Sequence, residues 1–272
     1  MNTREMVDIA IRLAGLTEDT VDTEIGCAGE EVHRVLAGID MSDAVMLAAK
    51  DMGYDCIAEH HGIMGKAMHI GDQMLKDQMM RMYEFGVPIN VAQKAIEKRA
   101  HHESERMHSK NLNRQAEFAK LIGMPYIGLH TPADLIGQKI VQDRMDKVNE
   151  NPFATLQDVV DALNEFPEIR NALQEPAIRV GEKDSYAGRI CVMYAGVTGG
   201  GAQVYKTFFD YGVGTLVMMH MPDDDIKAVA EQNKGNVIIA GHMGSDSIGF
   251  NRVLDAWEAA GLEVTRTGGI VV

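Results

Sequence analysis

Cysteine, aromatic residues and long apolar runs are all scarce in this sequence. Its 272 residues include three cysteines, one tryptophan and 6% aromatic side chains. Three widely spaced cysteines provide neither a disulfide framework nor a zinc-knuckle spacing, so a reducing cytoplasm is the expected compartment. No apolar run approaches the roughly 20 residues that a membrane span needs. Segment 1–16 mixes charges into its apolar positions and therefore predicts an amphipathic helix, not a signal peptide.

Basic residues are also fewer than acidic ones. The chain has 26 Lys and Arg against 40 Asp and Glu, which gives a net charge of −14. Because a nucleic-acid surface needs cations, this balance argues against a nucleic-acid partner. The 46% hydrophobic content and the chain length are sufficient for one large domain or two small ones. The 19 methionines lie at helical spacings, which favours core filling over copper binding.

The apolar patterns predict an α/β fold. A strand over 32–39, a helix over 44–52 and a strand over 54–58 form a strand–helix–strand unit, so the two strands should be parallel. Further strands are expected at 126–129, 189–194, 215–219, 236–240 and 263–267.

Residues 65–119 are predicted to be helical and polar, and the charged part from 94 to 110 is typical of a solvated helix. We expect a first lobe over residues 1–150, which contains this segment, and a second lobe over 151–272. The last helix and strand should complete the second lobe, although lobes of this kind can exchange terminal elements.

Polar side chains follow three of the predicted strands, at the point where each strand ends. They are His60, His61, His130, Asp134, His242 and Asp246. Carboxyl ends of parallel strands present side chains to one crevice, so these residues are candidates for a shared site. If a helix begins near Met243, His242 and Asp246 lie one turn apart on the same face.

Histidines and carboxylates together form a mixed nitrogen and oxygen ligand set that suits Zn, Mn, Fe, Ni or Co. Two such ions can lower the pKa of a bound water and clamp an oxyanion during hydrolysis. Structural explanations also exist: one histidine of the pair could be buried and the other exposed, and Asp134 could cap the next helix.

Two other patterns are weaker. Glu30-x-x-His33 and Glu105-x-x-His108 have the spacing of a di-iron helix bundle, but a strand follows the first pair and a solvated helix explains the second. The turn Gly196–Gly201 joins a strand to a helix and could cradle an anion. It lacks the lysine and the spacing of a Walker loop, so a simple tight turn is the alternative.

The motifs His-His-Gly (60–62), His-Thr-Pro-x-Asp (130–134), Thr-Gly-Gly-Gly (198–201) and Ala-Gly-His-x-x-x-acid (240–246) occur in the order found in the Nif-three-like family. Members are often named GTP cyclohydrolase I type 2 homologues or dinuclear metal-centre proteins. The resemblance covers most of the chain. It implies a two-lobed α/β/α fold with mixed sheets, a two-metal site in the cleft between the lobes, and a toroidal homohexamer.

Carried over by position, the resemblance implies that two divalent ions are held by five ligands. These are His60, His61, Asp134, His242 and Asp246. The last acid is usually glutamate in the family, and Asp246 is one methylene shorter. Where the family often has Thr-Gly-Glu, this chain has Met218-Met219-His220, so His220 could replace the lost carboxylate or add a ligand. The helical stretch at about 65–105 is longer than the usual connection and could cover the site or extend an oligomer contact.

The combined features favour a two-metal hydrolase that acts on a small phosphorylated or nucleotide-like substrate. Asp246, Asp134 and His220 are the candidate residues for proton transfer. The sequence shows no guanine-binding signature, which weakens the cyclohydrolase version of this hypothesis. The alternative is a non-enzymatic metal-binding regulatory or interaction protein, which would work as an oligomer with protein partners.

Overall fold

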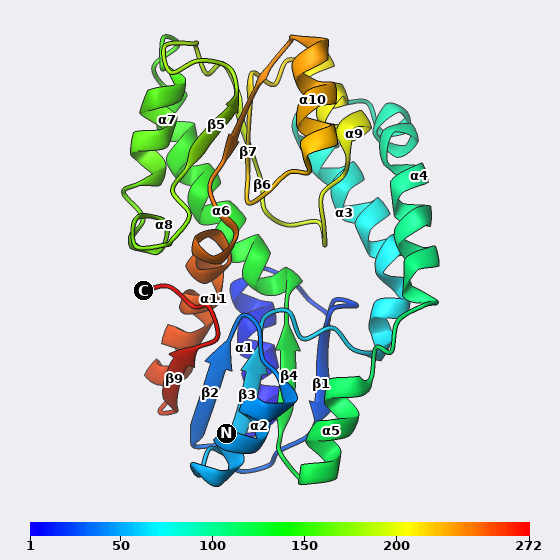
Figure 1. Cartoon of the computed structure of the whole chain (residues 1–272), viewed down its shortest axis with the longest axis vertical. Coiled ribbons are helices and arrows are strands. Elements are labelled where there is room, and N and C mark those ends of the chain that lie inside the picture. The colour runs from blue at the N-terminus through cyan, green and yellow to red at the C-terminus, as the bar shows by residue number, and fades with distance from the viewer. The chain divides into compact units, whose positions relative to one another are not determined.

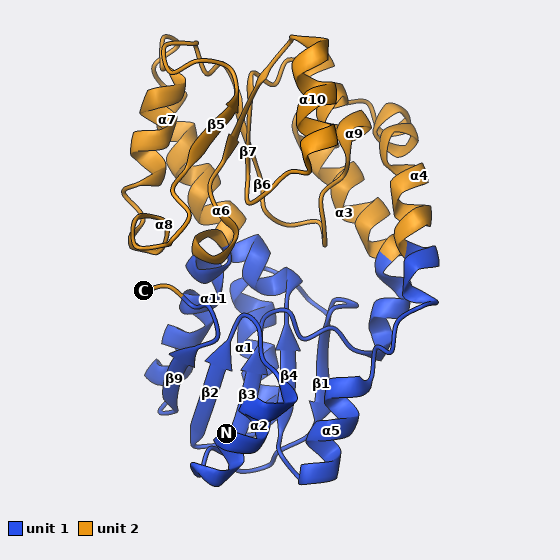
Figure 2. Cartoon of the chain, in the orientation of Figure 1, with its two compact units in different colours: residues 1–70, 104–136, 246–270 blue, residues 71–103, 137–245, 271–272 orange.

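The computed structural model describes all 272 residues, and short strands alternate with helices along the chain (Figure 1). The chain forms two compact units, which Figure 2 distinguishes by colour. The first unit comprises residues 1–70, 104–136 and 246–270, and the second comprises 71–103, 137–245 and 271–272. Both units are therefore discontinuous in the sequence. The division into lobes at residue 150 stays a prediction.

The first unit contains a mixed sheet of five strands in the order β1-β4-β3-β2-β9. The strands are β1 (Thr23–Cys27), β2 (Arg34–Gly38), β3 (Cys56–Glu59), β4 (Tyr126–Leu129) and β9 (Glu263–Thr267). β1 pairs antiparallel with β4, and the other neighbours are parallel. The predicted parallel pairing of β2 with β3 and the predicted α/β fold class are confirmed.

The last strand belongs to this first sheet. β9 pairs with β2 over the register Arg34↔Glu263 to Gly38↔Thr267. The expectation that it completes the second lobe is therefore wrong. The pairing joins residues more than 220 positions apart, and nothing in the local pattern of a strand specifies which distant edge it will meet.

Helices cover both faces of the first sheet. They are α1 (Thr3–Leu13), α2 (Asp43–Asp51), α5 (Arg114–Ile122) and the part of α11 (His242–Ala259) that lies in this unit. The α1 face carries a buried apolar stripe, and Trp257 of α11 donates its Nε1–H to the Met6 carbonyl at 3.0 Å. On the other face, Leu36 and Ile57 pack with Met46 of α2 and Ala119 of α5.

The second unit contains a mixed sheet of four strands in the order β5-β8-β7-β6. Its strands are β5 (Ala177–Val180), β6 (Ile190–Met193), β7 (Thr215–Met218) and β8 (Asn236–Ile239). β5 is antiparallel to β8, whereas β6, β7 and β8 are parallel. The helices that lie wholly or mostly in the second unit are α3 (Ile70–Glu84), α4 (Ile89–Met107), α6 (Thr131–Val148), α7 (Leu156–Leu163), α8 (Pro167–Arg170), α9 (Ala202–Asp210) and α10 (Asp223–Gln232).

The long helical segment contributes to the core of the second unit. Met82 and Phe85 of α3 and Ile96 of α4 pack in one cluster with Phe208 and Leu216. The expectation of a solvated helix over 94–110 is thus corrected, because one face of α4 is buried, and this buried set includes the charged Glu103. None of the helices combines the length and the hydropathy that a membrane span requires.

Candidate metal centre

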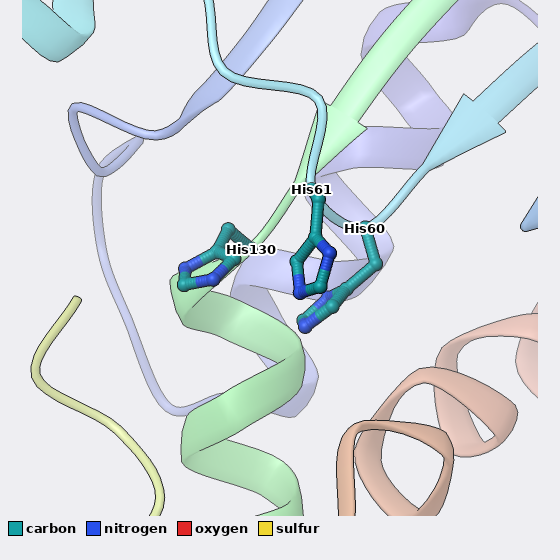
Figure 3. Close-up of side chains that lie close together, drawn as sticks. All are labelled: His60, His61 and His130. Atoms are coloured by element: carbon teal, nitrogen blue, oxygen red, sulfur yellow. The ribbon is translucent and has the colours of Figure 1, made fainter. Parts of the chain in front are cut away.

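Three histidines lie together in the first unit (Figure 3). His60 and His61 directly follow β3, and His130 lies between β4 and α6. The ring of His130 stacks on that of His60 with centroids 4.8 Å apart, and the His60 and His61 centroids are 4.9 Å apart. One ring nitrogen from each of the three lies within 4.8 Å of the others. Two adjacent strand ends therefore build one cluster of imidazoles.

The backbone extends the sheet as far as the histidine pair. The amides of His60 and His61 donate to the carbonyls of Gly38 and Ile39 at 2.9 and 3.0 Å, which continues the β2–β3 pairing beyond Glu59. The next residue, Gly62, lies directly against β4. A side chain at Gly128 would collide with the Gly62 carbonyl, so this close approach requires glycine. The histidine pair is thereby fixed by rigid backbone.

A buried carboxyl group supports the same turn. Glu59, only 3% exposed, accepts hydrogen bonds from the Tyr126 hydroxyl at 2.6 Å and the Met41 amide at 2.8 Å. Gln115 also donates to it, at 3.0 Å. Burial raises the pKa of Glu59, while these hydrogen bonds oppose the rise. The network ties the end of β3 to β4 and α5 just before His60.

Each histidine is oriented through its Nδ1 atom. His60 Nδ1 lies 3.0 Å from the Leu129 carbonyl, His61 Nδ1 lies 2.9 Å from Asp40 Oδ1, and His130 Nδ1 lies 2.9 Å from Asp22 Oδ2. All three partners accept, so Nδ1 carries the proton and donates. The lone pair of the neutral ring is then on Nε2. Histidines that bind metals through Nε2 are commonly held in this way.

Two buried carboxylates complete the cluster. Asp134 and Asp246 are 4% and 2% exposed. His60 Nε2 lies 3.3 Å from Asp134 Oδ1 and 3.7 Å from Asp246 Oδ1, and His61 Nε2 lies 3.4 Å from Asp246 Oδ2. Burial alone would lower the pKa of His60, but Asp246 and Asp134 raise it well above its usual value. The two carboxylates that favour a proton on this ring also favour a metal cation.

The donor set fits a divalent metal ion. His60 Nε2 and Asp134 Oδ1 are both buried, and neither makes a hydrogen bond. Buried polar atoms are normally satisfied, and a group left without a partner at a functional site calls for an explanation. The set of His60, Asp134 and Asp246 places one donor atom from each residue within 4.8 Å of the others. Imidazole and carboxylate groups that lie this close together can bind one ion of Zn, Mn, Fe, Ni or Co.

Two further predicted residues, His220 and His242, belong to the second unit. His242 is the first residue of α11, one turn before Asp246, as the sequence predicts. His220 follows β7 and its ring centroid lies 4.8 Å from that of His242. In the first unit, Asp134 is in the first turn of α6, which begins at Thr131, so it does not occupy the cap position. The assignment of individual ligands stays a prediction.

Sequence reasoning missed the residues that orient the cluster. Asp40 follows the end of β2. This position could have identified it, because a polar residue at the end of a parallel strand lies at the same edge of the sheet as the histidines. Asp22 precedes β1, a strand that the sequence did not predict, so no pattern pointed to it. The ligand set that the resemblance implies leaves out His130, although its ring stacks on that of His60.

Comparison with known proteins shows the family of the chain. The family model described as Duf34/NIF3 (NGG1p interacting factor 3) matches residues 11–267. A crystal structure of a NIF3 superfamily protein from Sphaerobacter thermophilus is 32% identical, covers 99% of this chain and 98% of its own, and superposes with a TM-score of 0.95.

More distant structures share the fold. Reduced HcgD from Methanocaldococcus jannaschii is 12% identical, covers 98% of this chain and 97% of its own, and has a TM-score of 0.60. TTHA1606 from Thermus thermophilus is 15% identical over 98% of this chain and 97% of its own, with a TM-score of 0.57. A search of curated proteins finds no match.

Proposed function

The chain belongs to the Duf34/NIF3 family, and from this premise we propose that it is a hydrolase that uses two divalent metal ions on a small phosphorylated or nucleotide-like substrate. The observation that carries the proposal is the buried cluster in which histidines anchored through Nδ1 meet two carboxylates. A purely structural histidine cluster would not need Asp134 beside His60 with both facing atoms lacking hydrogen bonds.

The proposed ligands are histidines and aspartates. They are His60, His61, Asp134, His242 and Asp246, to which we add His130 because its ring nitrogen lies with those of the histidine pair. Ions held there would supply a water of lowered pKa and positive charge for a substrate oxyanion. Asp22 and Asp40 would keep two of the rings in the orientation that presents Nε2.

Proton transfer is assigned to His220 in preference to the two aspartates. Asp134 and Asp246 are buried against His60, so they are poorly placed to exchange protons with water. The His220 side chain is exposed and lies beside His242. An imidazole that is accessible to water suits a general acid or base.

Two measurements on the same variants test the proposal. We expect wild type to carry about two divalent ions per chain by elemental analysis and to turn over a substrate in a panel of phosphoesters and nucleotides. His60→Ala should lose metal and activity together, whereas His220→Ala should keep its metal and lose most activity. His33→Ala, a change at an exposed histidine, is the matched control and should leave both unchanged.

Two outcomes would reject parts of the proposal. A wild-type protein that stays metal-free after loading with Zn, Mn, Fe, Ni and Co would reject the metal centre. Bound metal without turnover of any substrate in the panel would instead support the alternative, a non-enzymatic metal-binding regulatory protein. Pull-down of protein partners by the loaded and metal-free forms would then be the next measurement.

We also propose that the chain is cytoplasmic and assembles as a homo-oligomer, with the hexamer as the expected size. The location rests on three free cysteines, two of them buried, which a reducing compartment preserves. The oligomer rests on the family resemblance alone. Light scattering coupled to gel filtration measures the mass of the assembly, and a monomer at micromolar concentration would contradict the hexamer.

A further inference from the structure

A cavity lies wholly within the second unit. It has a volume of about 730 Å³, which is in the range of small-molecule sites. One wall is the face of α4 that carries Lys94, Lys98, Arg99 and His102. The lining also includes the turn 198–201 that leads into α9. The chain as a whole is strongly acidic, so a cavity walled by three permanent cations is an exception that needs a reason.

The cations form a continuous surface. Lys94, Lys98 and His102 are spaced four residues apart, so they lie in one row on the helix, and Arg99 is adjacent. Like charges at this spacing repel one another and destabilise the helix unless an anion neutralises them. Lys94 contacts Glu97 at 2.9 Å and Arg99 contacts Glu103 at 2.8 Å, but Lys98 makes no ion pair. The repulsion is therefore only partly relieved within the protein.

Acidic side chains contribute little to the cavity. Asp225 is its one acidic lining residue, and its Oδ1 accepts a hydrogen bond from the Ala202 amide at 2.9 Å. That contact engages the carboxylate at the start of α9. Three permanent cations thus face one carboxylate that already has a partner, and the balance of charge in the cavity is positive.

The glycine turn contributes bare backbone to the lining of the cavity. A Cβ at Gly200 would lie 2.9 Å from Val204 and one at Gly199 would lie 2.6 Å from the Tyr205 hydroxyl, so neither position accepts a side chain without movement. Gln78 of α3 fixes the turn by donating to the Thr198 carbonyl at 3.0 Å.

One feature of this turn indicates a functional role. Val197 has a φ of 73°, a strained value for a β-branched residue, and such strain concentrates at functional sites.

We propose that this cavity binds the phosphate chain of a small molecule that carries a diphosphate or triphosphate group. The nine residues from Lys94 to His102 span about 12 Å of helix, which is too long for one phosphate and suits a chain of them. Lysine and arginine donate strong charged hydrogen bonds to phosphate oxygens. Triphosphate binding in this cavity does not require the proposed hydrolase activity. The cavity lining does include His220, the proposed proton-transfer residue.

Calorimetric titration with inorganic triphosphate tests the inference on the full-length protein. We expect one site per chain in wild type. The double variant Lys94→Gln/Lys98→Gln should bind at least about tenfold more weakly, because hydrogen bonds to charged groups are lost. The control Lys76→Gln/Lys183→Gln removes the same charge from exposed positions outside the cavity and should bind as wild type does.

A third variant separates this cavity from the metal centre. His60→Ala should retain triphosphate binding even where it loses metal, because His60 is not part of the cavity. The inference is overturned if wild type does not bind triphosphate, or if both lysine pairs weaken binding equally, which would mean unspecific attraction. It is also overturned if His60→Ala abolishes binding while Lys94→Gln/Lys98→Gln does not, since the anion would then be bound by metal.

Discussion

The imidazole of His130 lies almost parallel to that of His60, with an angle of 20° between the planes and 4.8 Å between the centroids. Burial alone would lower the pKa of each ring, but the carboxylates around them raise it, Asp246 and Asp134 for His60 and Asp134 and Asp22 for His130. Two positive rings in contact repel one another. A metal bound to neutral rings removes that conflict.

His130→Ala should therefore lower the metal content, from about two ions per chain to about one, as measured by elemental analysis of dialysed protein. The reason is that His130 supplies one of three ring nitrogens within 4.8 Å of one another. His108→Ala, which changes an exposed histidine after α4, serves as the control. Unchanged metal content in His130→Ala would show that this ring is only a packing neighbour of His60.

Asp22→Asn should weaken metal affinity by roughly 10- to 100-fold, because Asp22 fixes the ring of His130 and accepts from Thr20 and Thr131 as well. Asp40→Asn should have a smaller effect, since Asp40 is 68% exposed and orients a single ring. Competition with a metal indicator dye measures both. The exposed Asp51→Asn should match wild type, and a larger effect for Asp40 than for Asp22 would contradict the order.

Gly128→Ala should destabilise the first unit by about 1–3 kcal/mol, as overpacking of a tight contact generally does. Its new Cβ would collide with the Gly62 carbonyl and displace the histidine pair, so metal binding should fall too. Gly15→Ala is the comparison: nothing lies near its Cβ, and only the φ of 72° opposes the substitution. Urea unfolding and metal content measure both. Metal binding retained in Gly128→Ala would mean that the turn tolerates movement.

Asp19→Asn should cost about 0.5–1 kcal/mol of stability at neutral pH, the value of a partly exposed ion pair. Arg4 holds Asp19 through two hydrogen bonds of 2.8 Å and lowers the pKa of its carboxyl group. A lowered pKa stabilises the folded state above the unfolded pKa of about 3.9, and this contribution disappears as pH falls below it.

Urea unfolding at several pH values tests this sign. The difference between wild type and Asp19→Asn should be constant from about pH 8 to pH 5 and should shrink below about pH 4. Asp51→Asn, at an exposed residue, should show no such dependence on pH. If the stability difference between wild type and Asp19→Asn grows as the pH is lowered, Arg4 does not stabilise the anionic form of Asp19.

The sequence predicted the buried parallel strands well, because a short apolar run that ends in a turn has few other interpretations. β4 and β9 were found with the bounds that the structure shows. β1 and β5 were missed, and both lie at sheet edges with antiparallel pairing. Their residues are mixed in polarity and partly exposed, so neither strand leaves a clear pattern.

The part of the candidate site that lies at the ends of predicted strands was predictable from the sequence. His60, His61 and Asp134 follow strands that the sequence shows, and the fold brings them together. The hydrogen bonds of Asp22 and Asp40 depend on three-dimensional proximity between distant segments, so no spacing in the sequence could show them. The same reason explains why β9 was placed in the wrong lobe.

The first unit draws its residues from three separate stretches, and the last of them, 246–270, supplies both Asp246 and β9. During synthesis, the ribosome releases His60, His61 and Asp134 long before this stretch exists. The nascent chain can therefore present only part of the cluster, without one of its two carboxylates and without β9, one of the two strands that pair with β2. The complete set of proposed ligands can therefore form only after the C-terminal stretch has been synthesised.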